Sequence, residues 1–398
     1  MKANLALAAL FLGMFVMGST ELLVVGVLDL IAADLRVSIP AAGALVTTYA
    51  LGLAVGGPLL TALTIRLNKR TVLAGSLVLF IAGTAVAVLT TSYPLFLVAR
   101  TVTGALQGLF IAAAFAAGTA VVPPARTGRA IAVVISGTTV TGAVGVPLGT
   151  LAAQTLGWHG SFLTAAAFAV VALVATLMLV PSVPSTGTGA ASQVRHALAP
   201  RVLAVLGMTV LVFASVYAAL TYLVPFLHTV TAVSGGLVSV FLLAYGVATA
   251  VGSFGGGRFA DADAARTLVV GTVGVTACLL ALYLFGSVAV LVLLAVLAVG
   301  GCAMGMAPSM QYRVVSLAGP GGAFAQSLPA SAANVGIAFG SFAGGVAVGA
   351  FTVSTAVIAG VVLAAVAIPV AWASSFLAPP SPAAATGVEY PRREVVQV

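Results

Sequence analysis

Twelve apolar stretches make up most of this chain, and each is long enough to cross a bilayer. Gly, Pro and charged residues separate them at approximately 5–31, 41–65, 71–91, 94–121, 129–155, 160–180, 202–227, 235–258, 266–285, 287–309, 323–349 and 353–377. A helix needs about 20 apolar residues to cross a hydrocarbon core of about 30 Å. With 62% hydrophobic and 6% charged residues, the chain has too few polar side chains to cover a water-soluble globule. The sequence therefore predicts an all-α membrane protein with 12 transmembrane helices.

The longest polar interruption divides these stretches into two sets of six. Residues 181–201 are rich in Ser, Thr, Gly and Pro, a composition typical of a flexible linker. We therefore expect an N-terminal six-helix bundle at 1–180 and a C-terminal six-helix bundle at 202–377. The remaining segment, 378–398, contains a Pro and Ala run and is expected to be a disordered tail.

The first stretch is too long for the core of a signal peptide, so a retained first helix is expected. Cys278 and Cys302 both lie in apolar stretches and show no paired spacing in loops. The sequence therefore predicts neither a disulfide framework nor a metal site.

The basic residues follow the alternation of the loops. One side of the membrane receives thirteen of the fifteen, namely Lys2, Arg66, Lys69, Arg70, Arg126, Arg129, Arg195, Arg201, Arg258, Arg266, Arg313, Arg392 and Arg393. The opposite loops contain only Arg36. By the positive-inside rule both termini, including the tail, are expected to be cytoplasmic. The net charge of +8 then reflects orientation in the membrane, and a nucleic-acid partner is not predicted.

Three charged residues remain in the interior of apolar stretches: Glu21, Asp29 and Arg100. Glu21 lies about 24 Å along the first helix, and Arg100 lies about 9 Å into the fourth from the opposite side, at 1.5 Å per residue. Both positions fall at a similar level in the outer half of the membrane. Ionisable residues inside a membrane commonly mark a pathway. We therefore expect Glu21 to bind and release a proton with Arg100 as its partner; the alternative is a static ion pair that fixes helix packing.

Asp29 follows Glu21 by eight residues, about two helical turns. It is interpreted either as a second proton or cation site or as a solvated acid at the helix end, as expected for nearby Asp34.

Two loops separated by about half the chain carry related patterns. Residues 257–266 begin with Gly257, have Asp261 four residues later and end with Arg266; their counterpart, 61–70, begins 196 residues earlier. The later loop resembles the loop signature of the major facilitator superfamily, which is built from such repeats. The earlier copy has Thr61 and Ile65 at the Gly and Asp positions. The resemblance implies cytoplasmic gate loops that contain Arg66, Lys69, Arg70, Gly257, Asp261 and Arg266, with Asp261 able to cap a helix.

Two further segments extend this resemblance. Residues 100–108 are similar to the buried-arginine motif of the superfamily, and residues 142–149 resemble the Gly/Pro motif of its exporters. Small residues allow helices to approach closely, and a proline removes one backbone donor and bends a helix. A helix-five hinge is therefore expected at Gly142, Gly145, Pro147 and Gly149. Generic small-residue packing is the alternative, because the chain contains 45 Gly.

The resemblance spans the full chain and is closest to the branch of chloramphenicol, sugar and purine-nucleoside exporters. It implies the major facilitator fold, with two pseudo-symmetric halves around a central cavity. Uncharged polar residues fall in the stretches that line this cavity in relatives, and the candidates are Gln107, Tyr217, Tyr222, Tyr245, Gln326 and Asn334. Each of these side chains taken alone is also compatible with ordinary helix packing. Apart from Glu21, Arg100 and Asp29, the interiors of the stretches expected to line the cavity offer no charged side chain to bind a charged cargo. A neutral or weakly cationic molecule is therefore expected.

The sequence thus predicts proton-coupled efflux, by antiport and alternating access, of a small organic molecule such as a chloramphenicol-like antibiotic. A metabolite such as a purine nucleoside or a sugar is the alternative cargo, and a membrane sensor that has lost transport is a third interpretation. An enzyme is not predicted, because the sequence shows no catalytic cluster. The expected partners are the cargo, protons and the lipid bilayer, with the proton motive force in place of a cofactor. A monomer in a bacterial inner or plasma membrane is expected.

Overall fold

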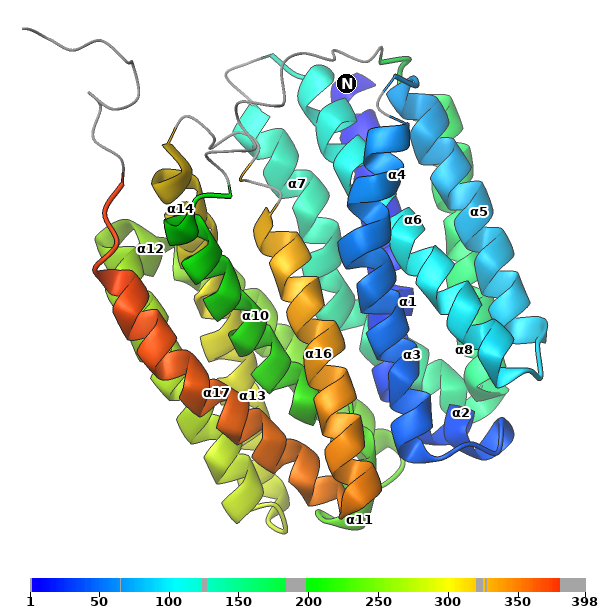
Figure 1. Ribbon diagram of the computed structural model, residues 1–398. Coiled ribbons are helices and arrows are strands. Elements are labelled where there is room, and N and C mark those ends of the chain that lie inside the picture. The colour runs from blue at the N-terminus through cyan, green and yellow to red at the C-terminus, as the bar shows by residue number, and fades with distance from the viewer. Residues whose placement is uncertain are drawn as a thin grey trace, which may run out of the picture.

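The computed structural model describes residues 2–64, 66–123, 127–183, 198–319, 325 and 328–379. These residues form helices and no strand (Figure 1). Before the predicted linker, the helices are α1 (Lys2–Gly26), α2 (Leu28–Asp34), α3 (Ile39–Leu51), η1 (Gly52–Gly56), α4 (Gly57–Leu63), α5 (Lys69–Leu89), α6 (Tyr93–Ala120), α7 (Thr127–Val140), η3 (Thr141–Gly145) and α8 (Val146–Leu179). After it come α10 (Pro200–Leu220), α11 (Leu223–Thr229), α12 (Gly236–Leu284), α13 (Ala289–Gly305), α14 (Ala307–Ala318), α16 (Leu328–Ala350) and α17 (Val353–Ser375).

Eleven helical stretches of the described chain are long and apolar enough to cross a membrane. One of them, Val133–Leu179, has 47 residues. A continuous helix of that length would measure about 70 Å, more than twice the hydrocarbon core. Its backbone leaves the helical conformation at Gly157, with φ 68° and ψ 173°, which glycine adopts without a steric penalty. This stretch therefore contains two spans, and the predicted set of twelve is confirmed.

The structure ends the first span earlier than expected. The predicted stretch 5–31 becomes the span Ala3–Gly26, followed by a turn at Val27 and the separate short helix α2. Asp29 lies on α2, beyond the span, so its placement inside the first transmembrane helix was wrong. Residues 184–197 of the predicted linker and 380–398 of the predicted tail lie outside the described residues.

One end of the bundle carries the loop bases Arg66, Lys69, Arg70, Arg258 and Arg266, together with the start of α1; we call it the basic end. The opposite end carries α2 and α11, and we call it the far end (Figure 1). The last carbonyl groups of a helix have no partner within the helix. At the basic end, arginine side chains occupy several of them.

Three such contacts are formed. The side chain of Arg70 donates to the carbonyl of Leu177 near the end of α8. Arg201 donates to the carbonyl of Leu317 in α14 at 2.7 Å. Arg313 binds the end of α17 through two carbonyls, Ser374 at 2.6 Å and Leu377 at 3.0 Å. Bases predicted as orientation signals therefore also hold helix ends together.

The hydrophobic core shows where the two six-helix halves meet. One cluster lies within the N-terminal half and includes Leu10, Leu77 and Phe110. The other cluster combines residues from both halves, such as Leu45 and Leu227. Its N-terminal members come from the portions of their helices that lie toward the far end, so the halves share a core there.

Helix α3 packs on α16, and η3 and α8 pack on α12, which closes this junction from two sides. The hydroxyl of Ser341 in α16 donates to the carbonyl of Gly43 in α3 at 3.0 Å. Across the second pair, Gly246 of α12 lies against the backbone of Gly142, so closely that a Cβ atom at Gly246 would meet the Gly142 carbonyl. Backbone-to-backbone packing of this kind requires glycine.

Replacing Gly246 with valine is expected to lower the free energy of unfolding by about 1–3 kcal/mol, because the added carbons force α12 away from η3. Unfolding in mixed micelles, followed by circular dichroism, measures this change. Gly255→Val on the same helix is the matched control, since a Cβ atom there meets nothing within 4 Å. Equal losses in the two variants would contradict the close packing at Gly246.

Candidate functional site

Arg100 lies at the junction of three helices, with only 2% of its surface exposed. From α6, its guanidinium donates to the carbonyl oxygens of Thr20 at 3.0 Å, Glu21 at 3.3 Å and Leu45 at 3.5 Å. Its Cζ atom lies 3.9 Å from the centroid of the Tyr49 ring. A buried charge is tolerated only when its donors are satisfied. Arg100 meets this requirement with main-chain oxygens and an aromatic face, and so ties α1, α3 and α6 together.

The carboxylate of Glu21 is held by a different residue. The amide Nε2 of Gln107, two turns after Arg100 on α6, donates to Glu21 Oε2 at 2.7 Å. The hydroxyl of Tyr49 in turn donates to Oε1 of the same amide, and it also lies 3.4 Å from the carbonyl of Met17. Glu21, Gln107 and Tyr49 therefore form a hydrogen-bonded chain that runs from α1 through α6 to α3.

The structure brings Glu21 and Arg100 together, as the sequence predicted, but in a different arrangement. Within the described residues the two side chains form no ion pair, because Arg100 binds the main-chain oxygen of Glu21. Sequence reasoning missed Tyr49, which contacts both Arg100 and Gln107. The available signal was a tyrosine in an apolar stretch, since a buried hydroxyl needs a partner.

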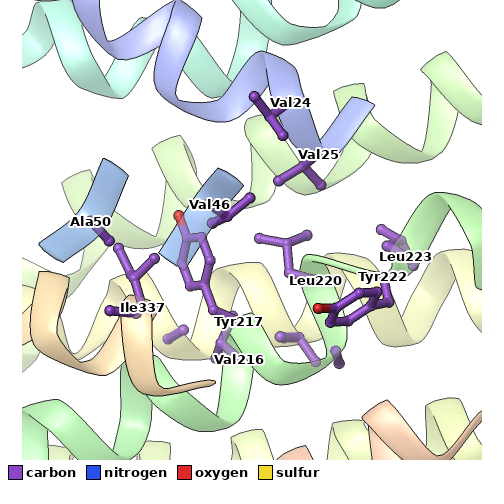
Figure 2. Packing of buried hydrophobic residues seen from close by; sticks show 14 of the residues in the cluster. Val24, Val25, Val46, Ala50, Val216, Tyr217, Leu220, Tyr222, Leu223 and Ile337 are labelled. Atoms are coloured by element: carbon purple, nitrogen blue, oxygen red, sulfur yellow. The ribbon is translucent and has the colours of Figure 1, made fainter. Parts of the chain in front are cut away.

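A narrow pocket lies beside the hydrogen-bonded residues Glu21 and Tyr49, where the two halves meet. Its lining consists of Glu21, Leu22, Val25, Val46, Tyr49, Ala50, Tyr217 and Ile337. Figure 2 shows Tyr217 extending from α10 toward Val46 and Ala50 of α3, with Ile337 of α16 beside it. The space between the side chains does not admit the centre of a water-sized sphere. The pocket is therefore closed around its side chains in this conformation.

Of the other predicted cavity residues, Tyr222, Tyr245 and Asn334 are not part of the lining of this pocket. Tyr222 donates to the carbonyl of Ser341 at 3.1 Å, in the junction near the far end. Tyr245 lines a separate, mostly apolar gap inside the C-terminal half. Asn334 donates to Ala330 at 3.0 Å, and its buried Oδ1 has no hydrogen-bond partner. Gln326 lies outside the described residues.

The predicted hinge in the fifth helix coincides with a change of helix type. Gly142 and Gly145 lie in η3, a π-helical turn, and Pro147 is at the start of α8 directly after it. Because proline offers no backbone donor, the wider turn accommodates the break in hydrogen bonding. Cβ atoms at Gly145 and Gly149 would meet Ser19 and Leu23 of α1. These glycines are therefore needed for close packing on α1.

A second π-helical turn was not expected. η1 (Gly52–Gly56) interrupts the second span just before Pro58, which again lies at the start of the helix that follows. The Gly-Gly-Pro run at 56–58 was the available signal. Both π turns therefore lie in helices of the N-terminal half that contact the C-terminal half, η1 against α16 and η3 against α12.

The described part of the loops at the basic end contains two side-chain caps. Asn68 caps α5 by accepting from the backbone N–H of Arg70 at 3.0 Å, and Asp263 accepts from the N–H of Arg266 at 2.9 Å. The side chain of Asp261, which was predicted to cap, lies outside the described residues. Among the other predicted gate residues, Arg66 and Arg266 are exposed, Gly257 is half-buried and the backbone N–H of Lys69 donates to Val183 at 3.0 Å.

At the far end, Asp29 pairs with His228 of α11, which belongs to the other half. The imidazole Nδ1 lies 2.7 Å from Asp29 Oδ2. The sequence left Asp29 between a second proton or cation site and a solvated acid at a helix end. Its pairing with His228 could not be read from residues 199 positions apart.

Twelve apolar spans around a closed pocket with one carboxylate define a polytopic membrane protein, built like a transporter. The profile of the Major Facilitator Superfamily matches residues 10–323, and the chain belongs to this superfamily of transporters.

Relatives support this assignment over most of their length. The chain is 33% identical to the uncharacterised MFS-type transporter YtbD of Bacillus subtilis, covering 86% of this chain and 89% of the relative. It is 31% identical to the inner membrane transport protein YdhP of Escherichia coli, covering 87% and 89%. It is 32% identical to the chloramphenicol resistance protein of Streptomyces lividans, covering 81% and 84%. The predicted location in a bacterial cell membrane agrees with these relatives and with the spans.

The fold matches a solved structure, the inward-facing, unoccupied form of a bacterial homologue of the human lysosomal transporter Spinster. The TM-score is 0.79 at 16% sequence identity, covering 94% of this chain and 97% of that one. The match confirms the predicted major facilitator fold.

Replacing Arg100 with lysine is expected to lower the free energy of unfolding by about 2–3 kcal/mol. A single ammonium group cannot reach all three carbonyls or stack on Tyr49 as a planar guanidinium does. Unfolding in mixed micelles tests this, with the exposed Arg258→Lys as the control. An Arg100→Lys protein as stable as the control would show that the three-helix contact contributes little.

Proposed function

We propose that this protein is a proton-coupled exporter of a small, neutral or weakly cationic organic molecule. The observation that carries the proposal is the position of Glu21, a carboxylate that lines a pocket between the two halves. In this proposal the basic end faces the cytoplasm and the far end faces outward, in keeping with the positive-inside rule. The transporter works as a monomer and is driven by the proton motive force.

Gln107 links the protonation state of Glu21 to the hydrogen bonds of Tyr49. While Glu21 is ionised, it accepts a hydrogen bond from the Gln107 Nε2 group, which leaves Gln107 Oε1 to accept from Tyr49. A protonated Glu21 is itself a donor and competes with Tyr49 for Oε1. The Tyr49 hydroxyl then turns to the carbonyl of Met17, which already lies 3.4 Å away. Protonation on α1 thereby changes the contacts of α3, a helix that packs on the other half.

Arg100 is the fixed part of this mechanism. Its donors are occupied by main-chain oxygens, so it neither pairs with the carboxylate nor offers a free positive charge to the cargo. Its charge nevertheless lies near Glu21 and favours the ionised carboxylate after proton release. The proposal therefore keeps Arg100 as the partner of Glu21, acting through the field of its charge.

The side chains that line the pocket determine which cargo charge it accepts. One carboxylate and two tyrosines, Tyr49 and Tyr217, face otherwise apolar side chains. An anionic molecule would be repelled by the ionised Glu21, whereas a neutral or weakly cationic one gains hydrogen bonds and apolar contact. The similarity to the chloramphenicol resistance protein of Streptomyces lividans makes a chloramphenicol-like antibiotic the first cargo to test.

In the proposed cycle, the structure represents the state that is closed at the far end. The shared core and the glycine contacts join the halves there, and the similar Spinster homologue was solved in an inward-facing form. Opening outward requires the halves to separate along α3 and α16 and along η3 and α12. The two π turns supply the bends for this movement.

Glu21→Gln is expected to abolish proton-driven accumulation of cargo in inverted membrane vesicles, because an amide cannot bind and release the proton. Exchange of labelled for unlabelled cargo without a proton gradient is expected to persist, since the amide still fills the same site. Asp34→Asn is the matched control, because Asp34 lies at the far end and binds Trp158 at 3.1 Å. Gradient-driven accumulation by Glu21→Gln at the level of this control would contradict the proton role.

The cargo is identified first by drug susceptibility in a sensitive bacterial host that expresses the wild type or Glu21→Gln. The panel is led by chloramphenicol and includes purine analogues. Protection by the wild type alone against one class names the cargo class. Equal susceptibility of all strains, despite confirmed expression, would remove the support for drug export and favour a metabolite cargo or a sensor.

Tyr217→Phe is expected to raise the KM for the cargo about fivefold, which corresponds to the loss of one hydrogen bond of about 1 kcal/mol. The maximal rate should change little, because the ring that fills the pocket remains. Tyr283→Phe is the control, as Tyr283 is 41% exposed on the surface of the C-terminal half and lines none of the pockets described above. An unchanged KM in Tyr217→Phe would show that its hydroxyl does not contact the cargo.

A further inference from the structure

Asp29 and His228 form a polar contact that joins the two halves at the far end. Asp29 lies on α2, after the first span, and His228 lies at the end of α11. The 2.7 Å contact between Oδ2 and Nδ1 is that of a strong hydrogen bond or ion pair. It lies within the region where the halves share a core, so it must break when that region opens.

The second oxygen of the Asp29 carboxylate, Oδ1, has an unusual environment for a buried polar atom. Asp29 Oδ1 is buried and has no hydrogen-bond partner, while 25% of the side chain is exposed. A buried oxygen without a donor costs free energy, and the cost is greatest when the group carries a full negative charge. The closed arrangement therefore suits a carboxylate whose charge is neutralised by a proton on the pair.

We propose that Asp29 and His228 are a second proton-binding site, in which one shared proton latches the far end in its closed state. With the proton present, the pair is an imidazolium and a carboxylate, or a neutral acid and a neutral imidazole, and either form is held by the short contact. Without it, a partly buried carboxylate faces a neutral imidazole, and separation into water becomes favourable. The site goes beyond Glu21, although it rests on the proposed movement between two states.

The direction of the pH dependence follows from proton linkage. Burial raises the pKa of the Asp29 carboxyl above its ordinary value, and the neighbouring His228 only partly offsets this. In an open far end both side chains are solvated, so the closed state holds the proton more tightly than the open state. Acid therefore favours closure, and opening increases as the pH rises. For an exporter driven by external protons, a proton that arrives from outside would close the outer side.

The acids, the tyrosine and the histidine near Asp29 and His228 have partners of their own. The titratable or charged groups on α2, in the turn after it and on the described parts of the elements packed against α2 and α11 include Glu21, Asp34, Arg36, Tyr49 and His159. Glu21 and Tyr49 are bound through Gln107. Asp34 lies 3.7 Å from His159 and accepts from Trp158, and the exposed Arg36 is in the turn after α2. Helix α17, which also packs on α11, brings no titratable side chain.

The Asp34 and His159 pair is a matched control built into the fold. It also combines an aspartate and a histidine at the far end, but α2 and α8 both belong to the N-terminal half. Movement between the halves does not need to break it. A pH effect on opening should therefore depend on Asp29 and His228 and be independent of Asp34.

The test measures the distance between spin labels on the two halves of the full chain, without cargo, in lipid nanodiscs. Labels are placed at the exposed far-end positions Thr91→Cys and Ser287→Cys, in a background with Cys278→Ala and Cys302→Ala. Between about pH 5.5 and 8.5, the ratio of closed to open protein should fall about tenfold in the otherwise wild-type chain, because the closed state holds its proton to a higher pH than the open state does.

Asp29→Asn and His228→Gln should each lose most of this pH response, whereas Asp34→Asn should retain it. The exchanged pair Asp29→His with His228→Asp should restore a response, which separates the latch from a defect in folding. A wild-type ratio that does not change with pH, or the same response in Asp29→Asn as in Asp34→Asn, would overturn the proposal. Because no cargo or transport is involved, failure here is distinct from failure of the Glu21 mechanism.

Discussion

The burial of Arg100 is the constraint on which the central part of the structure depends. A guanidinium that is 2% exposed among apolar helices is stable only if several oxygens surround it. Those oxygens come from the backbone of α1 and α3, and this sets the rotation and height of both helices relative to α6. The Tyr49 ring covers the guanidinium and is thereby placed to reach Gln107. The hydrogen-bonded chain that ends on Glu21 is therefore a consequence of satisfying one buried charge.

The junction between the halves combines two kinds of contact with different consequences for movement. Glycine contacts such as Gly246 on Gly142 involve no change of charge, so their strength is nearly independent of pH. They allow the helices to approach closely and can separate without exposing a polar side chain. The contact between Asp29 and His228 changes with protonation. A junction that is mostly apolar but contains one titratable pair can respond to protons without depending on them for its stability.

The sequence was sufficient to predict the spans and the buried charges, because an acid or base in an apolar stretch is conspicuous. Glu21 and Arg100 were found in this way, and the structure brings them together. The actual partners of Arg100 could not be predicted, since they are main-chain oxygens, which leave no mark in a sequence. Tyr49 was missed because a tyrosine among apolar residues is usual in a membrane helix. The partner of Asp29 was missed because it depends on the approach of the two halves, and the caps Asn68 and Asp263 depend on local backbone geometry.

Four arginines and three acids of this chain have different kinds of partner. Arg70, Arg100, Arg201 and Arg313 donate to backbone carbonyls, which cannot change their charge. Glu21, Asp29 and Asp34 are bound by side chains that can reorient or titrate, namely Gln107, His228, Trp158 and His159. A group that carries protons must be able to lose its charge while its surroundings adjust, and an arginine cannot do so at physiological pH. The positive charges can therefore act as fixed parts of the scaffold, and proton movement falls to the few acids.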